Sequence, residues 1–162
     1  MTARLLMPAA LFAALAAPAF ADEGDLGAYL FRGDCAGFAP EQVVKDIGEL
    51  ELDDDEYDEW RRVAPDGAPM PARLHIADED TNRVSAAEIV GGGFAVAVTA
   101  ADSPGAVLLA CAALPEGLAL PAVVELAEIG GSGIAGRVAV EAIGRDMRFT
   151  TAAFAVGAAP AL

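Results

Sequence analysis

The chain has 162 residues and carries 25 acidic against 10 basic side chains, which gives a formal net charge of −15 at pH 7. Such an excess of negative charge repels the phosphates of nucleic acids and anionic lipid headgroups, so it excludes functions that rest on binding either of them. Cations or basic protein surfaces are the natural partners of such a chain, although solubility alone explains the charge equally well.

The first residues predict a secretory signal that is removed after export. Arg4 supplies a positive start, residues 5–20 form an apolar run, and Ala19-Phe20-Ala21 has the small-x-small pattern that a signal peptidase requires. The run is too short, and too often interrupted by proline, for a membrane anchor. We therefore expect residues 1–21 to be cleaved and residues 22–162 to form one periplasmic or secreted domain. Loss of the signal leaves 9 basic and 25 acidic residues and a net charge of −16.

The two cysteines, Cys35 and Cys111, lie far apart in a chain that is bound for an oxidising compartment. They do not form a C-x-x-C redox pair, and two thiols cannot complete a zinc site. The residues therefore indicate a structural disulfide. Closing a loop of this length stabilises a fold by about 4 kcal/mol on the chain-entropy argument.

Short β-prone segments separated by glycine and proline turns run through the mature chain. The predicted strands are residues 28–32, 43–52, 72–77, 82–85, 94–99, 106–113, 123–129, 137–142 and 147–151. Residues 53–62 and 86–90 predict short helical turns, and residues 78–82 predict a turn between two strands. Because no long segment has the 3.6-residue period of a helix, we predict an all-β fold, an antiparallel β-sandwich of about eight strands with one disulfide.

Alternation within two of these strands also predicts which side chains face the core. Phe94, Val96 and Val98 share one face of their strand. Phe149 and Thr151 share one face of the last strand.

Three short pieces of the chain together resemble one protein family. They are the turn Gly33-Asp34-Cys35-Ala36, the strand Gly93-Phe94-Ala95-Val96-Ala97-Val98 and the strand end Leu109-Ala110-Cys111. Together they are similar to the small exported superoxide-dismutase-like β-sandwiches of bacteria, which are related in appearance to the CHRD domain. The resemblance implies an immunoglobulin-like or superoxide-dismutase-like sandwich in which the cysteine turn is disulfide-bonded to a late strand.

A fourth piece, residues 131–140, resembles the Gly-Ser-Gly hairpin of the same family. It follows Cys111 in this chain, whereas the family usually places it before the cysteine turn. The resemblance therefore implies either a permuted single domain or a hairpin that is exchanged between two copies, which would make the protein a homodimer.

The chain departs from the family at the metal-binding histidines. Where those histidines would stand, this sequence has Tyr29, Leu30, Phe31 and Thr99. A redox copper site beside a zinc ion needs several imidazoles, so dismutase chemistry is excluded and no cofactor is expected.

His75 is the single histidine of the chain. As a functional residue it would be a metal ligand or an acid/base group, together with Met70 or with nearby carboxylates. The alternative is a surface histidine on a strand without a chemical role, which we favour because no second histidine or free cysteine can join it.

Two acidic stretches offer the oxygen ligands that calcium prefers. Asp78, Asp80 and Asn82 stand at alternate positions, but Arg83 occupies the position where a calcium-binding loop needs glycine. Residues 53–59 are richer in carboxylates and also lack that glycine. Solvated loops are the simpler interpretation of both stretches.

A candidate surface for binding a partner combines acidic and aromatic side chains. It consists of Asp53, Asp54, Asp55, Tyr57 and Trp60. An exposed aromatic pair beside carboxylates would suit a basic protein surface. The alternative is that the two aromatic rings cover one end of the apolar core.

No arrangement of nucleophile, base and acid is evident in the sequence, so we predict no catalytic residue and no enzyme. The prediction is a non-catalytic periplasmic binding or interaction module, whose partner is a basic protein surface or a divalent cation. The alternative is a metal-handling protein or an enzyme that uses His75 with nearby carboxylates.

Overall fold

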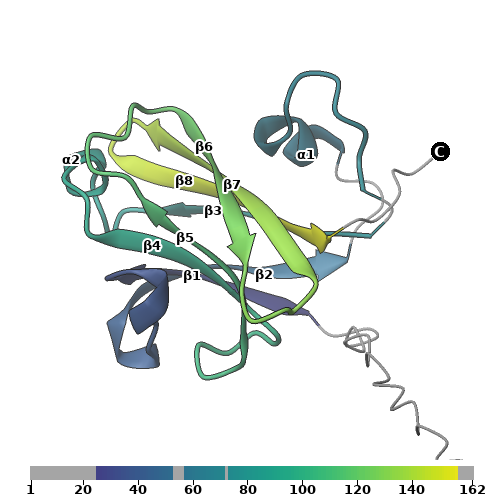
Figure 1. The fold of residues 1–162 in the computed structure, drawn as a ribbon. Helices are drawn as coiled ribbons and strands as arrows, with labels where there is room; N and C mark the ends of the chain where they lie inside the picture. The colour runs from purple at the N-terminus through teal and green to yellow at the C-terminus, as the bar shows by residue number, and fades with distance from the viewer. Residues whose placement is uncertain (1–24, 53–56, 72, 157–162) are drawn as a thin grey trace, which may run out of the picture.

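Alternating side chains and glycine-rich turns produce eight strands, two short α-helices and two 3-10 turns, Cys35–Gly37 and Pro40–Gln42, in the computed structural model, which describes residues 25–52, 57–71 and 73–156 (Figure 1). The elements are β1 Leu26–Arg32, β2 Val43–Leu52, α1 Tyr57–Val63, β3 Leu74–Thr81, α2 Ala86–Val90, β4 Phe94–Thr99, β5 Leu108–Leu114, β6 Ala122–Glu128, β7 Ile134–Ile143 and β8 Asp146–Ala155. Within these residues, no helix is long and apolar enough to cross a membrane. The predicted signal at residues 1–21 and the acidic residues Asp53, Asp54 and Asp55 lie outside the described residues.

The strands form one closed antiparallel barrel in the order β1-β2-β3-β8-β7-β6-β5-β4. β1 to β3 form one meander and β4 to β8 a second, and the connection that contains α2 joins the two. This arrangement confirms the all-β, antiparallel, eight-strand prediction and the disulfide between Cys35 and Cys111, which are 76 positions apart. The two-sheet sandwich is not confirmed, because the sheet is continuous around the barrel.

Two narrow seams nearly divide the barrel into two sheets. The β2–β3 ladder has two register pairs, Glu51↔Ile76 and Leu52↔His75. The β5–β6 ladder also has two. Beyond these pairs, β2 and β3 still pack closely at the first seam, because Gly48 has no side chain that would clash with Ala77. A Cβ atom added to Gly48 would lie 2.5 Å from the Cβ atom of Ala77. The barrel is therefore two four-stranded halves joined at narrow seams.

The interior of the barrel is filled by apolar side chains. They include Leu30, Val96, Phe149 and other inward-facing residues of all eight strands. At one end α2 contributes Ile89, which is fully buried against this core. A capping box between its N-terminal serine and a glutamate three residues later fixes where this short helix begins.

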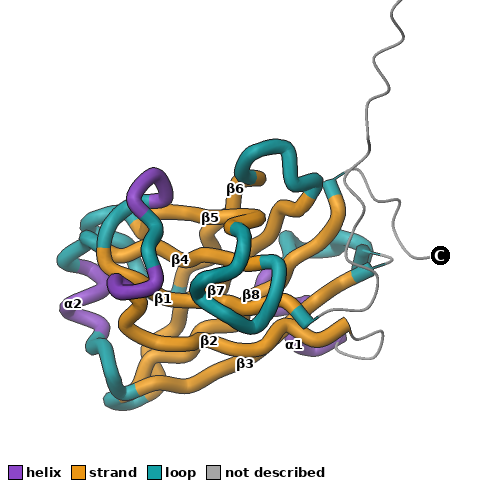
Figure 2. The backbone as a smooth tube through the Cα atoms, turned by 90° about the horizontal axis from the view of Figure 1, so that it is seen from below, coloured by secondary structure: helices purple, strands orange, loops and turns teal. Residues whose placement is uncertain are grey.

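Two short segments cover the outside of the barrel on opposite sides (Figure 1). On one side Trp60 and Val63 of α1 pack against Leu74 and other outward-facing residues of β3, β7 and β8. On the other side a segment that we call the strap, residues 34–42, crosses the outer face of β1, β4 and β5 (Figure 2). β4 thus lies between the barrel core on its inner face and the strap on its outer face, which explains why all six of its residues are buried.

The structure corrects two neighbouring predictions about local structure. Residues 78–82 do not form a turn, and residues 82–85 do not form a strand. β3 continues to Thr81 because it pairs with β8 along its whole length, for example Asp78↔Thr150 and Asp80↔Arg148. Cross-strand partners from a distant segment thus override the turn preference of aspartate.

The hairpin of β7 and β8 pairs with strands of its own chain on both sides, β6 and β3. The hairpin therefore completes the barrel of its own chain, and its permutation relative to the resembled family stays a prediction. Exchange of the hairpin between two copies stays a prediction.

Thr150 and Thr151 test whether the barrel interior is apolar. Both side chains are buried, but Thr151 faces the interior and Thr150 faces the outside of the barrel. Thr151 pairs across the sheet with the core residue Val138, and its hydroxyl has no hydrogen-bond partner among the described residues. Replacing this buried, unpartnered hydroxyl with a methyl group of similar shape removes a desolvation cost. We expect Thr151→Val to raise the free energy of unfolding by about 1 kcal/mol in a urea titration.

The matched control is Thr150→Val. The hydroxyl of Thr150 donates a hydrogen bond to Oδ1 of Asp78 over 2.9 Å. Its loss should lower the free energy of unfolding by about 1–2 kcal/mol. Destabilisation by both substitutions would contradict the placement of Thr151 in an apolar interior.

Candidate functional site

His75 lies in β3 with its side chain half-buried beside β2. Its Nδ1 atom is 3.3 Å from the backbone oxygen of Leu50, and burial lowers the pKa of His75 below its ordinary 6.5, so the ring is neutral at pH 7. Alternation in β3 directs Leu74 and Ile76 to the other face, where Met70 packs. His75 and Met70 therefore do not share a site. Within the described ranges, no group of three His, Cys, Asp or Glu side chains is arranged to hold a metal ion.

Asp78 and Asp80 lie on the outer face of β3 and are both bound to arginine. Arg148 donates hydrogen bonds to both carboxylate oxygens of Asp80, over 2.7 and 3.0 Å. Asp78 accepts hydrogen bonds from Arg62 over 2.6 Å and from Thr150. The hydrogen bond from Arg148 lowers the pKa of Asp80 below its ordinary value. A calcium ion would have to displace two guanidinium groups, so this arrangement does not favour the calcium interpretation.

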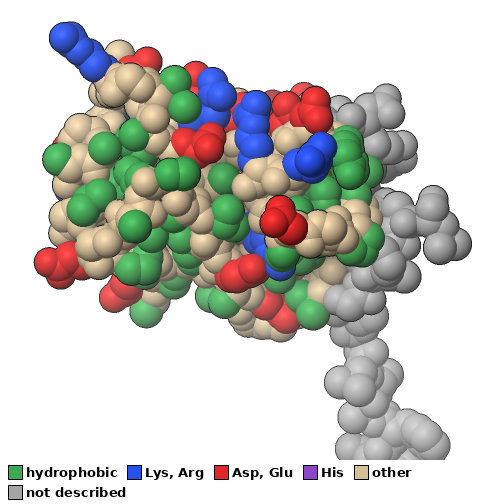
Figure 3. All heavy atoms as spheres, turned by 90° about the horizontal axis from the view of Figure 1, so that it is seen from above, with side chains coloured by type: hydrophobic (Ala, Val, Ile, Leu, Met, Phe, Trp, Pro, Cys, Tyr) green, Lys and Arg blue, Asp and Glu red, His purple; other side chains and the backbone are tan. Residues whose placement is uncertain are grey.

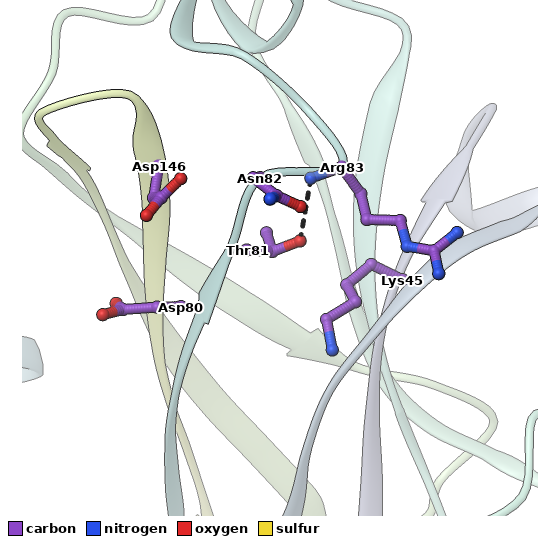
Figure 4. A pocket seen from close by; sticks show the side chains of 6 residues that line it. All are labelled: Lys45, Asp80, Thr81, Asn82, Arg83 and Asp146. Atoms are coloured by element: carbon purple, nitrogen blue, oxygen red, sulfur yellow. Dashed lines mark hydrogen bonds between the residues drawn. The ribbon is translucent and has the colours of Figure 1, made fainter.

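Asn82, the third predicted calcium ligand, lines a surface hollow of about 250 Å³ together with Asp80 but without Asp78 (Figure 4). The lining residues are Lys45, Asp80, Thr81, Asn82, Arg83 and Asp146. Figure 4 shows Lys45 and Arg83 on one side of the hollow and the two carboxylates on the other. Lys45 is bound to Glu79 over 2.8 Å and Asp80 to Arg148. The hollow therefore does not bring Asp78, Asp80 and Asn82 together as one set of ligands.

The predicted pair of exposed aromatic residues is wrong, because Trp60 is buried. Its indole N–H donates to the backbone oxygen of Ala68 over 3.4 Å, and its ring meets Phe154 edge to face. Tyr57 is 57% exposed and lies beneath the guanidinium group of Arg61. The alternative, that Trp60 covers one end of the apolar core, is confirmed in part. Trp60 covers an apolar cluster, but this cluster lies on the outside of the barrel.

A group of acidic residues that the sequence did not single out lies around Tyr29 and Glu49. We call it the acidic edge, and it consists of Asp25, Asp46, Glu49, Glu51 and Asp102. Tyr29 faces outward from β1 and is buried, and its hydroxyl donates a hydrogen bond to Oδ1 of Asp102 over 2.9 Å. This contact fixes the β4–β5 loop, which carries Asp102, against β1 and β2.

The acidic edge perturbs the titration of its own members. Burial and the contact with Asp102 raise the pKa of Tyr29 well above its ordinary value. A side-chain hydrogen bond with Asp25 and the neighbouring negative charges raise the pKa of Glu49 above its ordinary 4.5. Among the described residues, no lysine or arginine forms an ion pair with any of the five. No ion pair within the described part of the chain therefore compensates the negative charge of the acidic edge.

Strand register explains why sequence reasoning missed this group. The β1–β2 ladder places Gly27 opposite Glu49 and Tyr29 opposite Asp46. The Tyr29–Asp102 contact joins residues that are 73 positions apart. The alternation in β2 was a local signal for an acidic face, but nothing local to Asp102 linked it to that face.

Comparisons of the chain with known protein families, with curated proteins and with solved structures found no match. The superoxide-dismutase-like resemblance therefore stays a prediction that rests on the short pieces of sequence alone.

The raised pKa of Glu49 gives a second testable prediction. A carboxyl group whose pKa is higher in the folded state destabilises the fold once it ionises, so its contribution worsens as the pH rises through that pKa. We expect Glu49→Gln to raise the melting temperature at pH 7 and to have little effect near pH 4, where Glu49 is largely protonated.

Glu41→Gln is the control, because Glu41 is exposed and lies outside the acidic edge. It should leave the melting temperature nearly unchanged at both pH values. A lower melting temperature for Glu49→Gln at pH 7 would mean that the ionised carboxylate stabilises the fold, which is the opposite of our account.

Proposed function

We propose that the mature chain is a non-catalytic interaction module that recognises a basic protein surface through the acidic edge. The observation that carries the proposal is the unequal distribution of charge over the barrel. Negative charge without local compensation attracts cationic partners and speeds their association.

Positive charge is concentrated on the opposite side of the barrel. Five of the nine basic side chains that follow Arg4 belong to α1, β7, β8 and the turn between β7 and β8, namely Arg61, Arg62, Arg137, Arg145 and Arg148. Figure 3 looks onto this side and shows basic side chains interspersed with acidic ones. Arg137, for example, is bound to Glu125 over 2.8 Å. Three carboxylates on this side, those of Asp78, Asp80 and Glu125, form ion pairs with arginine, whereas none of the acidic-edge carboxylates forms an ion pair with a lysine or arginine among the described residues.

The acidic edge is also held in place by the fold. Its members lie on or beside β1, on β2 and on the β4–β5 loop, and Tyr29 ties this loop to the sheet. The hydroxyl of Thr99 donates to the backbone oxygen of Ala101 over 2.7 Å and fixes the start of the same loop. A surface whose side chains are ordered before binding loses less entropy when a partner arrives.

Two other functions have less support from the geometry. A divalent cation would need several oxygen ligands directed at one point, and such a group is not found among the described residues. An enzyme or metal-handling site at His75 would need a second chemical group, and the hydrogen-bond contact of its ring is with the backbone oxygen of Leu50. Export to the periplasm or beyond stays part of the proposal, and the disulfide is compatible with an oxidising compartment.

The proposal predicts where a cationic probe binds. We expect an oligolysine peptide to bind the mature protein, and the double substitution Asp25→Asn with Glu49→Gln to weaken that binding about three- to tenfold in a calorimetric titration. The control is Glu41→Gln with Glu116→Gln, which removes the same amount of charge outside the acidic edge.

The control pair should weaken binding by less than about twofold. Equal weakening by the two pairs would show that net charge alone attracts the probe, and the proposal of a localised site would then fail.

A further inference from the structure

We propose that the Cys35–Cys111 disulfide is a redox-controlled tether, so that reduction by a dithiol frees the strap and uncovers the outer face of β1, β4 and β5 while the barrel stays closed. The two Cα atoms are 5.8 Å apart, and the bond joins the strap to the outer face of β5. This device is separate from the acidic edge and does not depend on the proposed function.

The hydrogen bonds of the strap are the first argument, because all of those found among the described residues are local. Oδ1 of Asp34 accepts hydrogen bonds from the backbone N–H groups of Ala36 and Gly37. The backbone N–H groups of Gly37 and Gln42 donate within the strap. One further bond, from the backbone N–H of Val43 at the start of β2 to the backbone oxygen of Pro40, holds only the end of the strap that continues into β2.

Among the described residues, two side-chain contacts of the strap reach across to the outer face of the barrel. One is the disulfide, and the other is Phe38, whose ring meets that of Phe31 edge to face at 4.9 Å. Beneath them lie Phe31, Ala95 and Ala97, all fully buried. Burial of one aromatic ring is a modest anchor compared with a covalent bond, so the disulfide is the main tether.

A reductant can reach the bond from one side. Cys35 is partly exposed and lines a surface groove of about 330 Å³ between the strap and the β4–β5 loop, whereas Cys111 is buried. A thiolate of the dithiol would attack Sγ of Cys35, and the sulfur–sulfur bond would break with Cys111 leaving and taking up a proton. The second thiol of the reductant then displaces Cys35, so the protein gains two electrons and two protons and the dithiol becomes a disulfide.

The register pairs that close the barrel do not include the disulfide bond itself, and Cys111 keeps its pair with Ala127 at the β5–β6 seam when the bond is broken. Cys111 faces outward, and it belongs to a different apolar cluster from the core residues inside the barrel. Its cross-strand partners Ala97 and Ala127 are held by strand pairing that reduction does not touch. Loss of the bond therefore acts first on the strap.

The chain contains a matched pair of protease sites for the test. Glu41 lies in the strap, and Glu116 lies in the β5–β6 loop, which the disulfide does not tether. Both are exposed. A glutamyl endopeptidase is applied to the mature protein before and after treatment with dithiothreitol, and cleavage at each site is followed by mass spectrometry.

We expect reduction to speed cleavage after Glu41 about tenfold or more and cleavage after Glu116 less than about twofold, because cleavage follows the population of the locally opened state. Equal acceleration at both sites would mean that the whole barrel opens, and no acceleration at Glu41 would mean that the strap stays in place. Either result overturns the proposal.

Phe38→Ala in the oxidised protein separates the two anchors. We expect cleavage after Glu41 to stay within about twofold of the oxidised parent, because the disulfide still holds the strap. Release of the strap by Phe38→Ala as complete as that caused by reduction would make the ring the tether, and the proposal would fail.

Discussion

The antiparallel ladder between β3 and β8 is the interaction on which the rest of this structure depends. It joins the first meander to the last through register pairs that run from Leu74↔Phe154 to Thr81↔Met147. Inward side chains of β8, such as Phe149, enter the core, and outward side chains of β3 support α1 at one end. Without this ladder the two meanders would leave open strand edges, and neither outer surface would have its present form.

The same ladder decides how charge is distributed. Its outward carboxylates, Asp78 and Asp80, bind Arg62 and Arg148, and Lys45 spans the seam to Glu79. A chain with so few basic residues then has little positive charge left for the other side of the barrel. The uncompensated acidic edge is therefore a consequence of how the barrel closes, and the interaction proposed for it follows from the topology.

The sequence predicted the elements that depend on residues close together in the chain. It failed for the features that depend on residues far apart in the chain. The strand at 94–99 and the helical turn at 86–90 were predictable because alternation and a capping box are local signals. Residues 78–82 were assigned to a turn because their strand state depends on partners in β8, such as Thr150, which is 72 positions from Asp78. The sequence did not predict closure of the barrel, because closure depends on two seams with two register pairs each. It did not predict the acidic edge, because three separate segments of the chain supply its residues.

The central claim is that the acidic edge is the surface that meets a basic partner. The most direct measurement is an NMR titration of the isotope-labelled mature protein with an oligolysine peptide, with backbone amide shifts followed residue by residue. We predict that the largest shifts fall on Asp25, Tyr29, Glu49 and Asp102 and that the ion-paired face of β3 and β8 changes little. Shifts spread evenly over all exposed carboxylates, or concentrated around Asp78 and Asp80, would contradict the claim.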